Sequence, residues 1–165
     1  PPPPSTMPVG RLDHDSEGLL LMTTNGQLSY QILAEGQVAK EYFALVEGEP
    51  SLSSLEQLAE GVALTHRRDK YIAQASDVRR VSHARVHFPP RRQRTRDYRK
   101  TRDGTIISIP TTWLSLTVRH GRFHMVRKMT AAIGHPTLRL VRVRIGTVTL
   151  GDMAPGDVRP WDGQV

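Results

Sequence analysis

The chain has 165 residues, which is long enough to bury one hydrophobic core and too short for two ordinary domains. Its formal charge of +7 and its pI near 10.4, with an ordinary 24% of charged residues, indicate a polyanion as the natural partner. The absence of cysteine excludes disulfides, cysteine nucleophiles and thiolate metal sites, and no apolar run has the length of a membrane span.

Residues 9–23 place a dense polar cluster directly before an apolar run. The run at 19–23 predicts a short buried strand, because Gly18 and the turn dipeptide at 25–26 bound it. A carboxylate at the mouth of such a strand is held by rigid structure, which a reactive group needs in order to meet its substrate in one geometry. On composition alone, a solvated acidic turn is an equal alternative.

A metal-binding alternative also matches part of this cluster. Asp13, Asp15 and Glu17 have the spacing of the first half of a calcium loop. That loop requires a bidentate glutamate at its twelfth position, where this chain has Thr24, and an exit helix where a strand is predicted. We therefore predict no metal site, although a metal-dependent phosphoesterase that uses the same three carboxylates is an alternative function.

A short helix and a central strand are expected next. Leu28 and Ile32 lie four residues apart and predict a helix over residues 27–33, which Gly36 ends. Residues 40–48 follow as a strand that is apolar on both faces from Phe43 onward, as in the centre of a sheet.

A second helix is expected to begin at Ser53, which has capping-box spacing with Glu56. Its apolar face and its end are formed by Leu55, Leu58, Ala59, Val62 and Gly61. A basic stretch follows later, because seven of the twelve residues at 91–102 are Lys or Arg. That density predicts either a plain solvated loop or an RNA-contacting insertion at about 85–108.

The last third of the chain predicts two strands around a helix. Alternation of Leu and Val with Ser and Thr at 113–118 indicates a half-buried strand. A helix over residues 123–133 should bury the stripe Val126, Met129, Thr130 and Ile133 before Gly134 and Pro136 end it. The strand at 138–145 should place Val141, Val143 and Ile145 on one face and Arg142 and Arg144 on the other.

Three separated motifs resemble those of the pseudouridine synthases that modify ribosomal RNA. The first is Gly-Arg-Leu-Asp followed by Asp-Ser-Glu-Gly-Leu-Leu, within residues 10–20. The second is Lys-x-Tyr at 40–42, leading into Val-Glu-Gly, and the third is Gly-Arg-x-His-x-Val-Arg-Lys-Met-Thr-Ala at 121–131. The residues of these motifs are similar to those of the branch that contains the small-subunit enzyme and the large-subunit enzymes B, E and F, and most similar to those of the enzyme E group.

This resemblance implies a fold: an α+β catalytic domain over residues 8–165, with a mixed, mostly antiparallel sheet, flanking helices and a central RNA-binding cleft. Residues 1–7 are proline-rich and are expected to form an extended linker or the edge of a fragment. The family has further strands before its first motif. Because this chain opens almost at that motif, we expect those N-terminal strands to be missing and the domain to be partial.

The resemblance also implies an activity, the isomerisation of a specific uridine of ribosomal RNA to pseudouridine. The RNA is expected to be of the 23S type, and the target base is expected to be flipped out of the RNA stack. The family's nucleophile, its base-contacting tyrosine and the cation that pairs with the nucleophile fall on Asp13, Tyr42 and Arg127. Further RNA contacts would fall on Arg11, Lys40, Arg122, His124, Lys128 and Arg139. No cofactor is implied, and the expected protein is a monomer located in the cytoplasm or in an organelle that contains ribosomes.

One departure from the branch lies in the third motif, where Met125 stands in the place of a glutamine. We expect this change to alter RNA contacts without removing the nucleophile. The main alternative function is a non-catalytic rRNA-binding or ribosome-assembly protein derived from the same fold, because RNA binding alone would explain the charge and the basic stretch.

Overall fold

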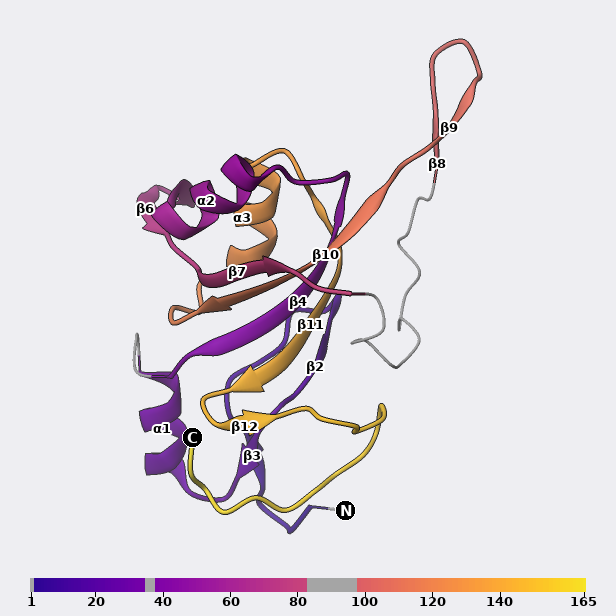
Figure 1. Ribbon diagram of the computed structural model, residues 1–165. Helices are drawn as coiled ribbons and strands as arrows, with labels where there is room; N and C mark the ends of the chain where they lie inside the picture. The colour runs from indigo at the N-terminus through magenta and orange to yellow at the C-terminus, as the bar shows by residue number, and fades with distance from the viewer. Residues whose placement is uncertain (1, 35–37, 83–97) are drawn as a thin grey trace.

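A computed structural model describes residues 2–34, 38–82 and 98–165, and its centre is a six-stranded sheet (Figure 1). The strand order is β12-β11-β4-β10-β7, and β2 pairs with β11 beside this path. The strands are β2 Ser16–Gly18, β4 Lys40–Glu47, β7 Ser76–Arg80, β10 Thr111–Val118, β11 Thr137–Ile145 and β12 Val148–Thr149. The β2–β11 pair is parallel and the other pairs are antiparallel. The predicted mixed, mostly antiparallel α+β sheet is therefore confirmed.

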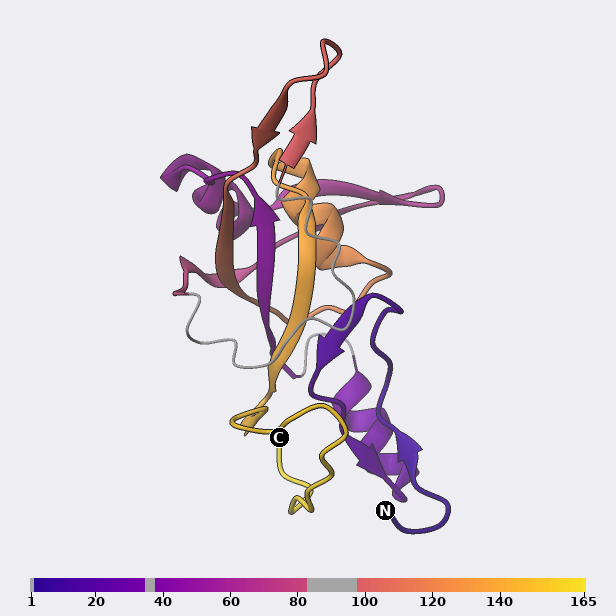
Figure 2. The same cartoon turned by 90° about the vertical axis from the view of Figure 1, so that its right-hand side faces the viewer.

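Smaller elements surround this sheet within the described residues. The helices are α1 Gly26–Leu33, α2 Leu52–Glu60 and α3 Met125–Ala132. The two-stranded sheets pair β1 Met7–Pro8 with β3 Met22–Thr23, β5 Val62–His66 with β6 Asp69–Ala73, and β8 Tyr98–Lys100 with β9 Ile106–Ser108. Figure 2 shows the β5–β6 and β8–β9 hairpins projecting from the body of the molecule.

The main core lies between the sheet and the two helices α2 and α3. Ala44 and Val46 of β4 and Leu114 and Leu116 of β10 are completely buried there, together with Met129 of α3. The opposite face of the sheet carries a smaller cluster of Phe43, Leu45, Trp113 and Val141. Burial on both faces explains the continuous apolar run of β4 and confirms the prediction that this strand is central.

The predicted strand at 19–23 is wrong as a single element. Residues 19–21 belong to no strand, because β2 ends at Gly18 on the central sheet and β3 begins at Met22 on the β1–β3 pair. Between them Leu19 and Leu21 are buried, while Leu20 is exposed. The apolar run is thus a crossing between two sheets, and its two buried leucines pack into a third cluster with Ile32 of α1.

The strand β10 is buried on both faces, which corrects the prediction that it is half-buried. Ser115 and Thr117 are as inaccessible as their apolar neighbours. The Ser115 hydroxyl donates to Glu41 Oε1 at 2.7 Å, and Arg144 Nη2 donates to Thr117 Oγ1 at 3.5 Å. Polar side chains can be buried there because a charged cluster on the same face satisfies their hydrogen bonds.

The strand β11 also differs from the prediction, because its register against β4 shifts between Arg142 and Arg144. Arg142 pairs with Tyr42, while Arg144 pairs with the next residue, Glu41. The shift therefore turns the two arginines to opposite faces of the sheet and brings Ile145 to the face of Arg142. Strict alternation had placed both arginines on a charged outer face, yet Arg142 is only 4% exposed.

The three helices are confirmed, with corrected starts for two of them. Asn25 caps α1, and Ile32 is buried as expected. The cap of α2 is Ser51, whose hydroxyl accepts from the Ser54 amide, so the predicted start at Ser53 is two residues late. The predicted face is correct at Leu55 and Leu58, whereas Ala59 is exposed and Val62 belongs to β5.

The helix α3 begins two residues later than predicted, because His124 adopts a left-handed φ of 51° that an α-helix cannot include. Its inward stripe of Val126, Met129 and Thr130 is buried as expected. Gly36 and most of the basic stretch at 91–102 lie outside the described residues. In the described ranges, no helix is both long and apolar enough to cross a bilayer.

Candidate active site

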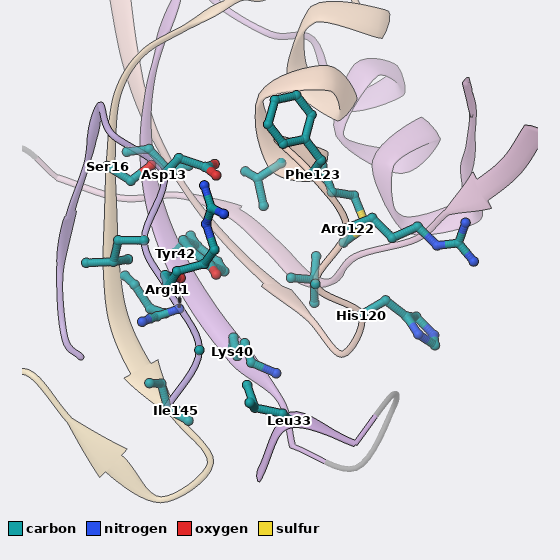
Figure 3. A pocket seen from close by; sticks show the side chains of 18 of the residues that line it. Arg11, Asp13, Ser16, Leu33, Lys40, Tyr42, His120, Arg122, Phe123 and Ile145 are labelled. Atoms are coloured by element: carbon teal, nitrogen blue, oxygen red, sulfur yellow. Dashed lines mark hydrogen bonds between the residues drawn. The ribbon is translucent and has the colours of Figure 1, made fainter. Parts of the chain in front are cut away.

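A cavity of about 450 Å³ opens where the segment before β2 faces the sheet and the start of α3 (Figure 3). Its walls come from residues 9–16, from β4, from the chain that follows β10, and from β11. Asp13, Tyr42, Arg11, Lys40 and Arg122, all chosen from sequence, line it. Three motifs that are far apart in the sequence therefore meet in one hollow.

Asp13 carries the one carboxylate among the described residues that line this cavity. Its side chain is about one-quarter exposed, and His124 Nε2 lies 3.6 Å from Asp13 Oδ1. The Asp13 carbonyl accepts a 2.8 Å hydrogen bond from the Ser16 amide, which closes a tight turn between the two residues. The carboxylate is therefore held by local backbone structure and remains open to a ligand.

Two arginines hold the Asp13 segment, residues 11–19, by its backbone. Arg142 Nε donates to the Leu19 carbonyl at 2.8 Å, and Arg142 Nη1 donates to the Arg11 carbonyl at 3.4 Å. Arg127 Nη2 donates to the Asp15 carbonyl at 2.7 Å and Arg127 Nη1 to the Thr137 carbonyl at 3.4 Å. The ends and the middle of the Asp13 segment are thus tied to β11 and α3.

Gly18 allows the segment to approach β11 closely. Its φ is 104°, and a Cβ atom at this position would overlap the backbone of Arg142. Ser16, Glu17 and Gly18 pair with residues 140–142 in the parallel β2–β11 ladder. Glycine is needed here both for the backbone conformation and for the space.

The cavity is strongly positive. Its described lining holds a single carboxylate and five cationic residues: Arg11, Lys40, Arg119, Arg122 and Arg142. Burial, and secondarily the neighbouring Arg142 cation, lowers the pKa of the Lys40 ammonium. Such a hollow attracts an anionic ligand and focuses its field on the space in front of Asp13.

Tyr42 and Arg11 lie between Asp13 and Lys40 along the cavity (Figure 3). Tyr42 is half-buried, and it packs against the main core while its residue lines the hollow. Its ring is thereby fixed by the sheet. This geometry suits a side chain that contacts a planar ligand.

The remaining candidates from sequence lie beside the cavity, outside its described lining. Lys128 Nζ donates to the Thr65 carbonyl at 3.1 Å. Arg139 forms a nearly buried ion pair with Glu17, with Nη2 2.8 Å from Oε2. The structure therefore brings Asp13, His124 and Tyr42 together and directs Arg139 toward Glu17 in the middle of β2.

Sequence reasoning missed Arg142, Ser16 and Phe123 as residues of this site. Arg142 alternates with aliphatic residues, which is also the pattern of a solvent-facing cation. It is buried because the segment around β2 pairs with β11 and accepts its hydrogen bonds. The Gly-Leu-Leu ending of the first motif was the available signal for a close approach. It could not identify the partner strand.

The three carboxylates of the metal alternative point to three different side chains. Asp13 faces His124, Asp15 Oδ1 lies 3.2 Å from His14 Nδ1, and Glu17 pairs with Arg139. In the part of the chain that the structure describes, no group of three or more His, Asp or Glu side chains is placed to hold a metal. The three carboxylates therefore do not converge on one position, as a metal-dependent phosphoesterase centred on Asp13 would require.

Comparisons with known proteins agree with the motifs. The family model described as RNA pseudouridylate synthase matches residues 3–132. The chain belongs to this family. It is 39% identical over 163 residues to the ribosomal large subunit pseudouridine synthase E of Xanthomonas campestris pv. campestris, a match that covers 98% of the chain and 80% of that relative. It is 33% identical over 154 residues to the ribosomal small subunit pseudouridine synthase A of Escherichia coli, covering 92% of the chain and 54% of that protein.

A solved structure confirms the fold at the level of the family. The crystal structure of a pseudouridylate synthase superposes with a TM-score of 0.69 at 25% identity, and it covers 96% of this chain and 56% of that chain. The chain thus spans about half of the solved protein. The α+β synthase fold and the resemblance to the large-subunit enzyme E group are confirmed, and the chain is a member of a family of isomerases.

Proposed function

We propose that this pseudouridine synthase isomerises a uridine of large-subunit ribosomal RNA to pseudouridine, with Asp13 as the nucleophile. The observation that carries the proposal is the placement of Asp13, which supplies the lone carboxylate of the described lining in a hollow that also contains five cations and Tyr42. A phosphate-bearing nucleotide suits the cations, and its ribose or base would then lie in front of the carboxylate.

The reaction moves one bond and one proton. The target base leaves the RNA stack at a cost of about a few kcal/mol and enters the cavity. Asp13 forms a transient covalent bond with the nucleotide, the bond from C1′ to N1 breaks, and the uracil turns so that C1′ joins C5. The bond to Asp13 then breaks and its electron pair returns to the carboxylate. The proton of C5 departs and N1 gains one, so the product is an isomer of the substrate.

Tyr42 is the group we assign to the C5 proton. Its place along the cavity between Asp13 and Lys40 supports this role, because a base turning in front of Asp13 would lie against its ring (Figure 3). Arg11 lies beside it and is assigned to the RNA where the base has left. Lys40 and Arg122 are assigned to the phosphates that flank the target.

The cation that accompanies Asp13 is assigned to Arg127, as the motif implies. Its two hydrogen bonds to the carbonyls of Asp15 and Thr137 support a position beside the Asp13 turn, on the first turn of α3. His124 lies 3.6 Å from the carboxylate and is a second candidate for this place. Both come from the third motif, so one part of the chain supplies both candidates.

The assignment to large-subunit RNA is supported by relatives of this name at 39% and 40% identity, compared with 33% for the small-subunit enzyme. The proposed enzyme acts as a monomer without a metal or small-molecule cofactor, in the compartment that holds the ribosomes.

The test is to map pseudouridine in ribosomal RNA by carbodiimide-dependent reverse-transcription stops. Cells that lack the gene are complemented with the wild-type gene, with Asp13→Asn, or with Asp15→Asn as a matched control. Loss of a single large-subunit stop in the deletion and in Asp13→Asn, with retention in Asp15→Asn, is the expected result. Unchanged stops together with intact binding to ribosomal RNA would replace catalysis by a ribosome-assembly role.

A further inference from the structure

An exposed aromatic stack lies at the edge of the cavity, across from Asp13. The side chain of Phe123 is about half exposed, at 51%. Its ring is stacked on His124, with centroids 3.9 Å apart and planes 13° apart, and it tilts against His66 of β5 at 5.4 Å. Figure 3 shows Phe123 on the opposite side of the cavity from Asp13 and Ser16.

Two cations bind the start of α3 to the β5–β6 hairpin around this stack. Lys128 Nζ lies 5.7 Å from the centroid of Phe123 and donates to the Thr65 carbonyl. The Arg122 guanidinium lies 4.5 Å from the ring centroid of Tyr71 on β6. The aromatic stack is therefore held between two elements and has a defined orientation, although half of Phe123 is in solvent.

The end of the same hairpin is positive and open to solvent. Arg67, Arg68 and Lys70 are exposed there, and His66 and Asp69 pair across the last rung of the hairpin. A polyanionic strand that follows these cations toward the cavity passes the Phe123 ring before it reaches Asp13. The order along this path is cations, aromatic ring, then carboxylate.

We propose that Phe123, supported by His66 and His124, is a stacking platform for an unpaired nucleobase next to the target nucleotide. Lys128 and the hairpin cations bind the phosphates of the same RNA strand. The inference deepens the proposed function and rests on it for the identity of the RNA. Single-stranded RNA is the occupant because every base has a π-face that an aromatic ring can stack on, and positive side chains beside the ring track its backbone.

A single exposed apolar side chain is ordinary in a folded protein. Phe123 differs because its ring is stacked on the ring of His124, whose Nε2 lies 3.6 Å from the Asp13 carboxylate. A base on the exposed half of the Phe123 ring therefore lies beside the residue that contacts Asp13. This proximity suits a base next to the target nucleotide in the strand.

The test compares two polyanions, oligoadenylate, which carries bases, and inorganic polyphosphate, which carries none. Phe123→Ala and Phe123→Leu are expected to weaken oligoadenylate binding about tenfold, while Phe123→Trp retains it. Binding of polyphosphate should stay the same in all three. The indole fluorescence that Phe123→Trp introduces should fall on addition of oligoadenylate and not on addition of polyphosphate.

The matched control is Tyr30→Ala, which removes an aromatic ring of 77% exposure on α1. It should leave the binding of both polyanions unchanged. Equal binding of oligoadenylate by Phe123→Leu and Phe123→Trp would overturn the platform, and so would equal weakening toward both polyanions. Thermal unfolding of each variant identifies any that fails to fold, and the fluorescence of Phe123→Trp then decides the question.

Failure of this inference is distinguishable from failure of the proposed function. Binding of oligoadenylate does not require catalysis, so Asp13→Asn should bind as the wild type does. If the wild type forms no pseudouridine while the Phe123 variants still lose base-dependent binding, the platform stands and the synthase proposal falls. If pseudouridine forms and oligoadenylate binding ignores Phe123, the platform is wrong.

Discussion

Replacement of Arg142 by methionine should separate activity from stability. Arg142 is buried at 4% exposure, and its hydrogen bonds go to the carbonyls of Leu19 and Arg11 on the two sides of Asp13. Its Nη2 atom is buried without a hydrogen-bond partner among the described residues. The neighbouring Lys40 is also positive, and Arg142 contributes to the lowering of the pKa of that ammonium.

Two effects of Arg142 on stability oppose one another: its hydrogen bonds stabilise the fold, and the burial of its charge destabilises it. A hydrogen bond from a charged donor contributes about 1.5–3 kcal/mol, so two of them fix the Asp13 segment by roughly 3–6 kcal/mol, with the 3.4 Å bond weighing less. Burying a cation costs several kcal/mol, and methionine removes that cost while filling a similar volume. The free energy of unfolding should therefore change by less than about 2 kcal/mol. The free energy that holds the segment closed falls by about 3 kcal/mol, so the population of its open conformation rises roughly a hundredfold.

The assay is the kcat and KM for pseudouridine formation in a ribosomal RNA transcript. Arg142→Met should lower kcat about a hundredfold with a smaller change in KM, because the carboxylate is displaced while the phosphate-binding surface remains. Hydrogen exchange at the amides of Ser16 and Leu19, both of which are hydrogen-bonded in the folded segment, should accelerate. Arg79→Met removes a half-exposed cation from the other face and serves as control. An unchanged kcat in Arg142→Met would refute the role of the two hydrogen bonds.

Three further perturbations test the site and its scaffold. Tyr42→Phe keeps the ring and removes the hydroxyl, so kcat should fall about a hundredfold with KM retained, and an unchanged pseudouridine yield would leave Tyr42 only a stacking role. Gly18→Ala should lower the free energy of unfolding by at least about 2 kcal/mol in urea titrations, because φ is 104° and Cβ meets the backbone of Arg142, while Gly26→Ala, with open space, should be neutral or stabilising. For Glu41, burial raises the pKa, but hydrogen bonds from Ser115 and Arg144 and the nearby positive charges outweigh it, so its pKa lies below 4.5. Ionised Glu41 therefore stabilises the fold above pH 4.5, and this contribution is lost as the pH falls below that value. The plot of unfolding free energy against pH should be flatter in acid for Glu41→Gln than for the wild type, and parallel plots would contradict this.

Local patterns were sufficient for the elements that are decided by their own residues. The apolar run of β4 predicts burial on both faces, and Asn25 and Gly61 mark the limits of α1 and α2 as their chemistry requires. The Asp13 motif was also visible, through its resemblance to the first motif of the family, since an acidic turn before an apolar run is common by itself. In each case the side chain that identifies the feature is also the one that causes it.

The remaining features depend on partners that lie far away in the sequence. Ser115 looks like a solvent-facing residue until Glu41 is seen beside it, and the register shift in β11 follows from how that strand pairs with β4. The hairpin of β5 and β6 was missed because Val62 was assigned to the face of the second helix, which left the alternation of Val62 and Leu64 unread. Such features are set by tertiary contacts, which periodicity does not encode.

The way the arginines are used makes Asp13 a clean target for mutation. Arg142 and Arg127 hold the segment through the carbonyls of Arg11, Leu19 and Asp15, and these acceptors do not depend on the charge of any side chain. The turn itself is closed by the Ser16 amide and the Asp13 carbonyl. Asp13→Asn therefore removes the nucleophilic charge and leaves the backbone supports of the segment in place. Wild-type stability and RNA binding with no pseudouridine formed are the expected outcome, whereas a large loss of stability would mean that the Asp13 carboxylate itself supports the fold.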